Sequence, residues 1–478
     1  MNESPQDTRR AFLKSLGMAG AVLAAPHGWG LAQTAATRRP PNVVFILVDD
    51  MGWPDPACYG HPFHETPHID RLASQGMRFT DAYAAAPVCS PTRASILSGQ
   101  YPAHVGITDF IPGHWRPYAK LRVPTNRQQY LPLEVTTFAE ALGGAGYTCG
   151  AFGKWHLGGP KHFPDKQGFD QTLVTSGRHF GSRSVPDIGI GKDDYLTEVL
   201  SEQAEDFMDA HQDEPFFLYL AHYAVHIPLE AREALIDKYR NKPKPGTGVN
   251  NPVYAAMVEH VDQSVGRVLG KIDELGLADN TVVVFFSDNG GLRQRFDGDG
   301  GIVSTNAPLR DEKGTLYEGG IREPLIVRWP GAVKPGSVCA EPVTSVDFYP
   351  TFLEMAGATG DAKHVLDGES LVPLLREGGR LKRESIYWHY PHYHHSSPAG
   401  ALRKGPWKLI EFYEDGRLEL YNLRDDLSET TNLAEKRADL AQELQRELAA
   451  WRSAVGAELP TENPDYDPAR AHEWGKHP

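Results

Sequence analysis

The sequence predicts an α/β fold in which a large mixed, mostly parallel sheet is sandwiched by helices. Apolar, β-rich runs alternate with helical patterns as far as about residue 330, which is typical of such a sheet. After about residue 384 short aromatic runs separated by turn residues take over, and they predict a smaller C-terminal α+β subdomain built on an antiparallel sheet. The 478 residues, 40% hydrophobic and 23% charged, suffice for both parts.

The elements of the main sheet follow the apolar patterns in chain order. Residues 42–48 are continuously apolar after the first position, as in a strand buried on both faces. Helices are expected near residues 69–74 and 136–142, and a long amphipathic helix over residues 254–275. Further strands are expected at residues 147–152, 215–221, 281–286 and 324–329.

The C-terminal part of the sequence has a different residue pattern. Turn residues such as Glu414-Asp415-Gly416 separate the runs, and the pattern ends in a helical stretch. The expected elements are strands at residues 386–390, 407–412 and 417–421 and a closing helix over residues 433–455. We therefore expect a main domain over residues 40–378 and a subdomain over residues 379–478.

The N-terminal segment resembles a twin-arginine export signal. Arg9 and Arg10 precede a Gly- and Ala-rich apolar run at residues 16–25, and Gly30 and Ala32 form a small-x-small cleavage pattern. The run is shorter than the roughly 20 residues of a spanning helix, so no stable membrane insertion is expected. Residues 1–32 are thus predicted to be a signal peptide used by the twin-arginine translocase of a bacterium, and the mature protein to be periplasmic or secreted. A disordered leader or an uncleaved anchor is the alternative.

Charge and cysteine content exclude several classes of protein. The formal charge is −14 and no Lys/Arg run stands out, so nucleic acid is not an expected partner. Cys58, Cys149 and Cys339 match neither a CxxC metal site nor a dense disulfide framework. Cys149, in a strand-like run, is expected to be buried as a small hydrophobic residue.

The fourth cysteine lies in Cys89-Ser90-Pro91-Thr92-Arg93, at a predicted helix N-terminus. Backbone N–H groups and the positive end of the helix dipole favour negative charge there, and Arg93 follows one turn later on the same face. Such a position suits an anion-binding site, although Cys89 could also be simply a thiol of low pKa.

Polar residues follow the predicted strands at the edge of the sheet where chemistry collects in α/β proteins. Asp49 and Asp50 follow the first strand, and Asp288 and Asn289 follow the strand at residues 281–286. Their hard oxygen donors suit Ca²⁺ or Mg²⁺ better than zinc. Each pair alone could be a polar turn, but the two strand ends together with Cys89 favour a cation site.

Cationic and imidazole side chains follow other strands. Lys154 and His156 come after the strand at residues 147–152 and would share one side if the chain stays extended. His226 follows the strand at residues 215–221, and Lys313 precedes the strand at residues 324–329. Taken singly, such residues are usually surface charges or packing groups.

The Cys-x-Pro-x-Arg motif and the order of these blocks over residues 41–330 resemble the formylglycine-dependent sulfatases of the alkaline-phosphatase superfamily. The similarity is greatest to bacterial secreted carbohydrate sulfatases related to arylsulfatase A and the N-acetylgalactosamine sulfatases. The resemblance implies a sulfatase domain at residues 40–378 and conversion of Cys89 to Cα-formylglycine by a formylglycine-generating enzyme before export. It also implies a divalent cation, commonly Ca²⁺ with Mg²⁺ possible, held by Asp49, Asp50, Cys89, Asp288 and Asn289.

The resemblance further implies roles for the cationic set. One hydroxyl of the formylglycine hydrate attacks sulfur, with Asp288 as a proton acceptor, while the cation, Arg93, Lys154 and Lys313 stabilise the sulfate charge. His226, with Lys313 nearby, protonates the departing oxygen, and His156 deprotonates the second hydroxyl so that sulfate leaves. The implied catalytic residues are Cys89, Arg93, Lys154, His156, His226 and Lys313.

The expected substrate is a sulfated carbohydrate, with terminal galactose or N-acetylgalactosamine sulfate preferred. Aromatic and polar residues at 109–116 and 389–395 are of the kind that contact sugars, and Ser176 or Ser182 could match a further serine contact of the family. Two alternatives are a phosphatase or phosphodiesterase of the same superfamily, and a noncatalytic sulfoglycan-binding protein in which position 89 stays a thiol.

Overall fold

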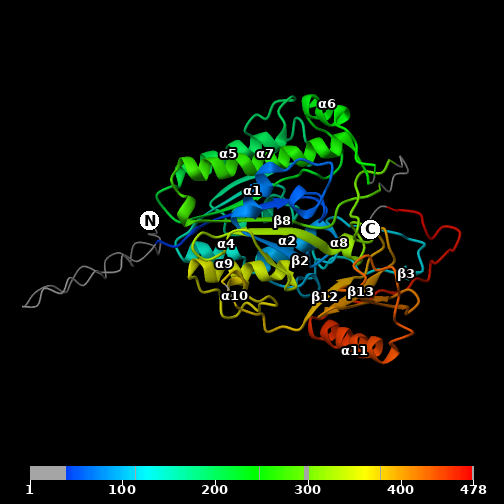
Figure 1. The fold of residues 1–478 in the computed structure, drawn as a ribbon. Coiled ribbons are helices and arrows are strands. Elements are labelled where there is room, and N and C mark those ends of the chain that lie inside the picture. Colours follow the sequence, from blue (N-terminus) through cyan, green and yellow to red (C-terminus); the bar gives the residue numbers. More distant parts are fainter. Residues whose placement is uncertain (1–38, 114, 247, 295–300, 377, 476–478) are drawn as a thin grey trace, which may run out of the picture. The chain divides into compact units, whose positions relative to one another are not determined.

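The computed structural model describes residues 39–113, 115–246, 248–294, 301–376 and 378–475, and the chain from Arg39 onward groups into one compact unit (Figure 1). The predicted signal peptide at residues 1–32 lies outside the described residues. Within the described ranges, none of the helices combines the length and the apolar character that crossing a bilayer requires.

A ten-stranded sheet forms the centre of this unit. Its strands are β1 (Asn42–Val48), β2 (Met77–Tyr83), β4 (Thr148–Gly153), β5 (Gln171–Thr175), β6 (Ser184–Val185), β7 (Phe216–Ala221), β8 (Thr281–Ser287), β9 (Arg322–Arg328), β10 (Ser337–Cys339) and β11 (Val343–Thr344). The order is β10-β2-β9-β8-β1-β7-β4-β5-β6, with β11 also beside β2. Strands β8, β1, β7, β4 and β5 are parallel neighbours, whereas β9 runs antiparallel to β2 and β8. The predicted mixed, mostly parallel sheet is confirmed.

Helices cover both faces of this sheet, as Figure 1 shows. Helices α1 (Pro67–Gln75), α5 (Leu196–Ala210) and α7 (Pro252–Glu274) lie on one face, and α2 (Cys89–Ser98), α4 (Phe138–Gly144) and α9 (Phe348–Ala356) on the other. Alternate residues of β1 enter two cores: Val44 and Ile46 join the core of the first helices, Phe45 and Leu47 that of the second. Burial on both faces explains why the strand is continuously apolar.

The remaining elements are short or peripheral. Besides several short 3-10 helices, they include α3 (Pro102–Val105), α6 (Glu233–Asn241), α8 (Glu318–Ile321), α10 (Val372–Leu375) and the small antiparallel pair β3 (Leu121–Arg122) and β16 (Thr461–Glu462). Helix α4 begins with a capping box, in which Thr137 accepts a hydrogen bond from the N–H of Glu140 and the Glu140 carboxylate accepts one from the N–H of Thr137.

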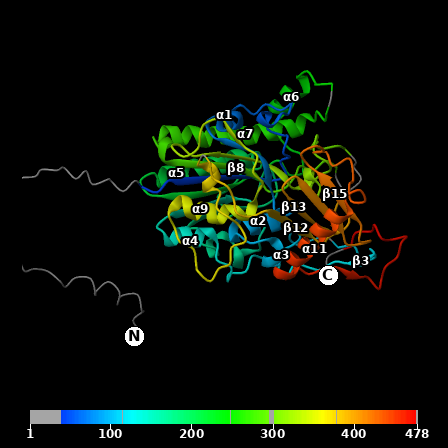
Figure 2. The same cartoon turned by 60° about the horizontal axis from the view of Figure 1, so that its bottom comes forward.

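A second sheet carries the C-terminal part of the chain. Strands β12 (Ser385–Tyr390), β13 (Ala399–Lys404), β14 (Trp407–Phe412) and β15 (Leu418–Asn422) are antiparallel neighbours in that order. Helix α11 (Ala438–Ala454) packs its Leu444 and Leu448 against this sheet, and Figure 2 shows it lying across the strands. The predicted antiparallel sheet and closing helix are confirmed, although the helix begins at residue 438, not 433. The domain boundary at residues 378/379 stays a prediction.

Buried charges tie the two sheets together. Lys408 of β14 is fully buried, and its Nζ lies 2.8 Å from a carboxylate oxygen of Glu318 in α8 and 2.8 Å from one of Glu429. Glu318 also accepts hydrogen bonds from Tyr83 and Arg322 of the main sheet. Because a buried charge without its partner is costly, this network fixes how the second sheet meets the first.

Candidate active site

The carboxyl ends of β1 and β8 bring four predicted side chains together. The parallel register pairs Val48 with Ser287, so Asp49 and Asp288 emerge side by side. The N–H of Asp50 donates to Asp288 Oδ1 at 3.2 Å, and Asn289 Nδ2 donates to Asp50 Oδ1 at 2.7 Å. Asp49, Asp50, Asp288 and Asn289 are all at most 1% exposed, so the site lies beneath the surface.

Each of the three buried carboxylates contacts a cation from another part of the chain. Lys154 Nζ lies 2.5 Å from Asp49 Oδ2, and Lys313 Nζ lies 2.7 Å from Asp50 Oδ1. Arg93 Nε donates to Asp288 Oδ2 at 2.9 Å. These contacts offset the large cost of burying the charges.

The cations also change the acidity of the carboxylates. Burial raises the pKa of Asp49, but Lys154 and the other nearby cations outweigh it and hold that pKa well below its usual range. Burial and the neighbouring Asp49 raise the pKa of Asp288 to about 7. Burial disfavours the charged form of Lys154, yet the Asp49 carboxylate raises the lysine pKa above its ordinary value.

Cys89 is the first residue of α2, and its Sγ lies 3.7 Å from Lys313 Nζ. The ligand atoms of Asp49, Asp50, Cys89 and His226 all lie within 4.8 Å of one another. Burial raises the pKa of the Cys89 thiol to about 12, although Lys154 and Lys313 pull it the other way. Desolvation therefore outweighs the positive field, and the thiol of low pKa considered from the sequence is not what this environment produces.

Arg93 lies deeper than the sequence suggested. Its side chain is fully buried, with Nη1 donating to the Lys154 carbonyl at 2.9 Å and Nη2 2.7 Å from Asp288 Oδ2. It contacts carboxylate and main chain, and it is not among the described residues that line the adjacent cavity. This geometry suits a residue that positions Asp288 and the Lys154 segment.

His156 reaches the site through a left-handed turn. The chain does not stay extended after β4, which was the condition under which Lys154 and His156 would share one side, because Gly153 has φ +113° and His156 has φ +58°. The Nε2–H of His156 donates to the Ile111 carbonyl at 2.7 Å, and Nδ1 is buried without a partner among the described residues. Burial and then Lys154 lower the pKa of His156 to about 3, so the ring is neutral with a lone pair on Nδ1.

His226 is held through the opposite ring nitrogen from His156. Its Nδ1–H donates to the Ile227 carbonyl at 2.7 Å, and its Nε2 lies 3.6 Å from Asp50 Oδ2. Burial, followed by the positive charge of Lys313, lowers the pKa of His226 to about 4. Asp50 has φ +61°, so two non-glycine residues of the site, Asp50 and His156, occupy the left-handed region, at about 1–3 kcal/mol each.

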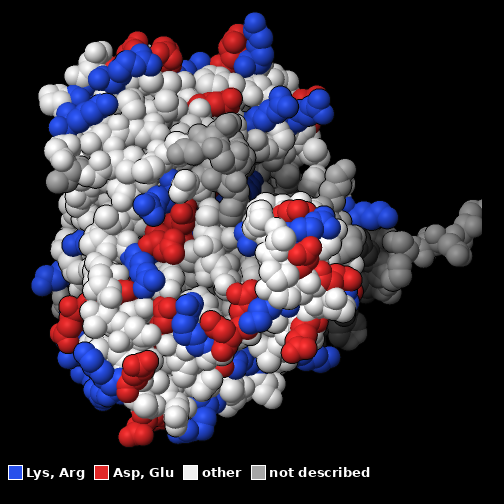
Figure 3. All heavy atoms as spheres, turned by 90° about the vertical axis from the view of Figure 1, so that its right-hand side faces the viewer, with Lys and Arg blue, Asp and Glu red and all other residues white. Residues whose placement is uncertain are grey.

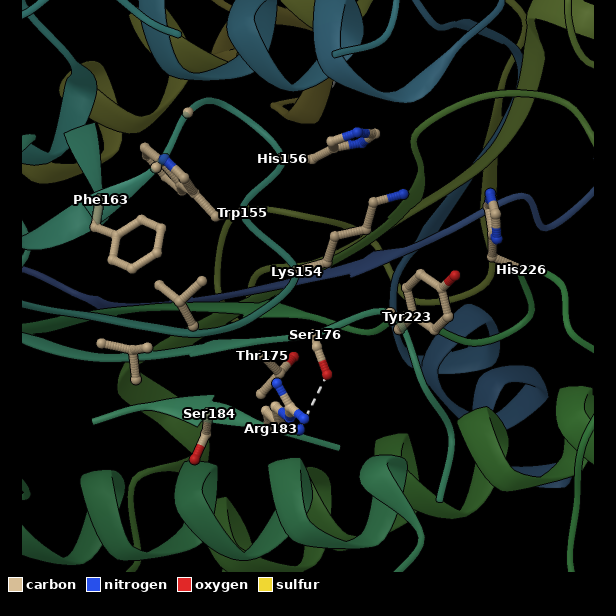
Figure 4. Close-up of a pocket in the computed structure, with 15 residues that line it drawn as sticks. Lys154, Trp155, His156, Phe163, Thr175, Ser176, Arg183, Ser184, Tyr223 and His226 are labelled. Carbon is tan, nitrogen blue, oxygen red and sulfur yellow. Dashed lines mark hydrogen bonds between the residues drawn. The ribbon is translucent and has the colours of Figure 1, made fainter. Parts of the chain in front are cut away.

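A cavity of about 560 Å³ opens beside this cluster (Figure 4). Lys154, His156 and His226 line it, so three predicted residues face the same space. Ser176, which the sequence suggested as one of two possible serine contacts, also lines the cavity, whereas the sequence carried no signal for the other lining residues, several of which come from the β5–β6 hairpin. These additional residues include Trp155, Phe163, Thr175, Ser176, Arg183, Ser184 and Tyr223.

The two segments expected to contact sugar are placed differently. None of the described residues of 109–116 and 389–395 lines the cavity, and His114 lies outside the described residues. Instead Ile111 accepts the hydrogen bond of His156, and His395 Nδ1 lies 2.9 Å from the Lys313 carbonyl. In the structure these segments support residues of the site.

The donor set fits a hard divalent cation. Asp49 Oδ1 and Asn289 Oδ1 are buried without a hydrogen-bond partner among the described residues, and such oxygens are costly unless something binds them. Three carboxylates and one amide oxygen are typical Ca²⁺ or Mg²⁺ ligands. Elsewhere, over the face shown in Figure 3, acidic and basic residues are intermixed and form no broad basic area.

This chain belongs to the sulfatase family: the model described as Sulfatase matches residues 41–358, and the model N-sulphoglucosamine sulphohydrolase, C-terminal, matches residues 311–454. It is similar to N-acetylgalactosamine-6-sulfatase of Sus scrofa, with 34% identity over 81% of this chain and 76% of the relative. Human arylsulfatase A is 35% identical over 81% and 77% of the two chains. The crystal structure of Ps i-CgsB superposes with a TM-score of 0.75 at 30% identity, covering 90% of this chain and 95% of that one.

The resemblance to arylsulfatase A and the N-acetylgalactosamine sulfatases is therefore confirmed, and the protein is a sulfatase, an enzyme that hydrolyses sulfate esters. Relatives of this kind support sugars as the carriers of the ester.

Proposed function

We propose that this sulfatase removes sulfate from terminal galactose or N-acetylgalactosamine, with Cys89 converted to formylglycine and a divalent cation in place. The observation that carries this proposal is the convergence of Cys89 Sγ, Lys313 Nζ and the strand-end carboxylates beside a cavity of sugar size. The name of the 34% identical N-acetylgalactosamine-6-sulfatase supports the choice of sugar.

Asp49, Asp50, Asp288, Asn289 and residue 89 would hold the cation, with Ca²⁺ proposed and Mg²⁺ as the alternative. A divalent cation supplies Lewis-acid stabilisation of charge on the sulfate oxygens. Lys154 contacts Asp49 and lowers the pKa of that carboxyl, so Asp49 stays ionised and ready to act as a ligand, and Lys313 contacts Asp50 at the same site.

Formylglycine, as its hydrate, supplies a nucleophilic hydroxyl and a second hydroxyl that allows sulfate to be expelled. The neutral His156, with its Nδ1 lone pair unpartnered, is suited to accept the proton of that second hydroxyl. Ser90 Oγ donates to the His156 carbonyl at 2.8 Å and thereby holds this histidine next to residue 89.

His226 is proposed to donate a proton to the departing sugar oxygen. Its Nδ1–H is fixed on the Ile227 carbonyl, so only Nε2 is available to carry a transferable proton. An anionic substrate beside the ring would raise the pKa of His226 from its low value and favour that protonated form. Lys154 and Lys313 lie where they can stabilise sulfate charge, while Arg93 keeps Asp288 in place.

We further propose that residues 1–32 direct export by the twin-arginine pathway to the periplasm or beyond. A formylglycine-generating enzyme would then act on Cys89 in the cytoplasm, since this pathway carries folded proteins. The Arg9-Arg10 pair and the following apolar run support this proposal.

Two measurements test the proposed function. Peptide mass spectrometry over residues 80–95 of protein from the native host should show the loss of mass that accompanies conversion of Cys89, and an unconverted thiol would refute the mechanism. When the enzyme is then assayed on a panel of regiodefined sulfated monosaccharides, it should release sulfate from galactose or N-acetylgalactosamine sulfates, and the Cys89→Ala variant should be inactive. Release only from glucosamine or fucose sulfates would refute the proposed sugar.

A further inference from the structure

Arg183 is a cation of the cavity whose charged end has no partner among the residues that the structure describes. Its guanidinium makes no hydrogen bond or ion pair with any residue in the described part of the chain, although its side chain is exposed and lines the cavity. Lys154, the other Lys or Arg in the lining, is already bound to Asp49. No Asp or Glu is among the described lining residues, so nothing on the cavity wall neutralises Arg183.

The backbone of Arg183 is nevertheless held firmly. Its N–H donates to Ser176 Oγ at 2.9 Å, and its carbonyl accepts a hydrogen bond from the N–H of Ser176 at 2.8 Å. Ser182 Oγ donates to the Ser176 carbonyl at 2.9 Å, and Thr175 pairs with Ser184 between β5 and β6. The root of the side chain is thus fixed while its charged end stays available, which lowers the entropic cost of binding a ligand.

The hairpin that carries Arg183 packs on Tyr223, which lies beside His226. A Cβ at Gly177 would stand 2.8 Å from the Tyr223 ring, so the hairpin backbone packs directly on that tyrosine. The centroids of the Tyr223 and His226 rings lie 5.1 Å apart, and Lys154 Nζ lies 5.5 Å from the centroid of the Tyr223 ring. Figure 4 shows Arg183 and Ser176 across the cavity from His156, with Tyr223 and His226 along one side.

We propose that Arg183 binds a second anionic group of the substrate, a sulfate or a carboxylate that is not hydrolysed. The preferred substrate is then a glycan with at least two negative charges near each other. This inference rests on the proposed function, because it takes His226 to face the departing sugar. The planar guanidinium matches both oxyanions with paired N–H donors, and Trp155, Phe163 and Val174 provide apolar contact for the sugar ring.

The test compares three substrates in the formylglycine-containing enzyme: 4-nitrophenyl sulfate, an N-acetylgalactosamine disulfate, and a monosulfated N-acetylgalactosamine linked to a uronic acid. Arg183→Gln is expected to lower kcat/KM about tenfold, through KM, for the disulfate or the uronate but less than twofold for 4-nitrophenyl sulfate. Arg183→Lys should restore part of the loss, and the loss should shrink at high salt because the side chain is exposed. Arg178→Gln is the matched control, since Arg178 is exposed on the same hairpin but does not line the cavity.

A loss confined to the disulfate identifies a second sulfate as the bound group, and a loss confined to the uronate identifies a carboxylate. Equal changes for all three substrates, or the same loss in Arg178→Gln, would overturn the proposal. If the unaltered enzyme hydrolyses none of them, the proposed function fails separately. Calorimetric binding of the disulfate to Cys89→Ser protein then decides: about tenfold weaker binding with Arg183→Gln supports the proposal, and equal affinity overturns it.

Discussion

Lys313 Nζ lies 3.7 Å from Cys89 Sγ and at the same time 2.7 Å from Asp50 Oδ1. One buried ammonium therefore contacts both Cys89, which is proposed to be modified, and a carboxylate of the proposed cation site. Burial disfavours the charged form of Lys313, but Asp50 outweighs it and raises the lysine pKa above its ordinary value. The ammonium is consequently a permanent positive charge at the point where sulfate charge is proposed to develop.

Replacing that ammonium should impair turnover far more than folding. Lys313→Met is expected to lower kcat about 100-fold or more, because it removes a positive charge from the site and leaves the Asp50 carboxylate without the ammonium that contacts it. Steady-state hydrolysis of 4-nitrophenyl sulfate measures the effect. Lys192→Met is the control, since Lys192 is exposed on the surface and, among the described residues, its ammonium pairs with the neighbouring Asp193 alone. Equal activity of the two variants would contradict the assignment of Lys313.

Removing the cation should abolish activity and weaken the fold. Chelation leaves Asp49 Oδ1 and Asn289 Oδ1 buried without a partner among the described residues. The free energy of unfolding should therefore be lower by about 3 kcal/mol than in protein kept at a Ca²⁺ concentration of about 100 times the Ca²⁺ dissociation constant. Thermal unfolding with and without added CaCl₂ measures this difference, and Asp288→Asn should reduce it. An unfolding midpoint that ignores both chelator and Ca²⁺ would argue against a cation at these residues.

Removing one partner of the buried ion pair between the sheets should cost several times more stability than removing one partner of an exposed ion pair. Lys408→Met leaves Glu318 and Glu429 buried and uncompensated, so we expect a loss of about 3–5 kcal/mol of stability. Lys404→Met is the matched control on the adjoining strand: the Lys404 side chain is 35% exposed, and its pair with Glu447 should contribute about 1 kcal/mol or less. Thermal unfolding of both variants gives the comparison, and similar midpoints would disprove the proposed role of Lys408.

One histidine outside the site should make stability depend on pH. His104 Nδ1 lies 3.0 Å from Asp367 Oδ2, and this hydrogen bond, with burial opposing it, raises the pKa of His104. Because the folded-state pKa is raised, the stabilisation is fully present below the ordinary histidine pKa of about 6.5 and is lost as pH rises through the folded-state value.

His104→Gln should therefore destabilise the protein more at pH 6 than at pH 8.5, by less than about 1 kcal/mol. Thermal unfolding at the two pH values measures it, with His472→Gln, at an exposed position, as the control. A destabilisation that is the same at both pH values would show that the Asp367 contact does not depend on protonation.

Residues whose position follows from strand register could be predicted from the sequence. Asp49 and Asp288 each follow a buried strand, and parallel pairing of β1 with β8 is enough to bring them together. Helix α7 was likewise visible because its apolar positions recur over 23 residues. The start of α11 was placed five residues early, because Leu433 and Ala434 continue the apolar pattern although the helical backbone begins only at Ala438.

Other features depend on contacts that no local pattern contains. The helical spacing put Arg93 on the face of Cys89, but only the folded structure shows that Asp288 and the Lys154 carbonyl take up its donors. The turn at His156 follows from glycine at 153 and a left-handed residue three positions on, not from periodicity. Arg183 carried no signal in the sequence, because it comes to the cavity through the pairing of β5 with β4 and the packing of Gly177 on Tyr223, and no local pattern contains either contact.

All ten residues of α2 are buried, and Cys89 is only 2% exposed. The proposed conversion of Cys89 would therefore have to take place on nascent or unfolded chains, because a modifying enzyme would have no access to it once the chain has folded. Under this proposal maturation and folding would compete for the same chain: the faster α2 is packed, the larger the share of molecules that would keep the thiol and stay inactive. Slower folding, by this reasoning, would raise the active fraction of the enzyme even while lowering its yield.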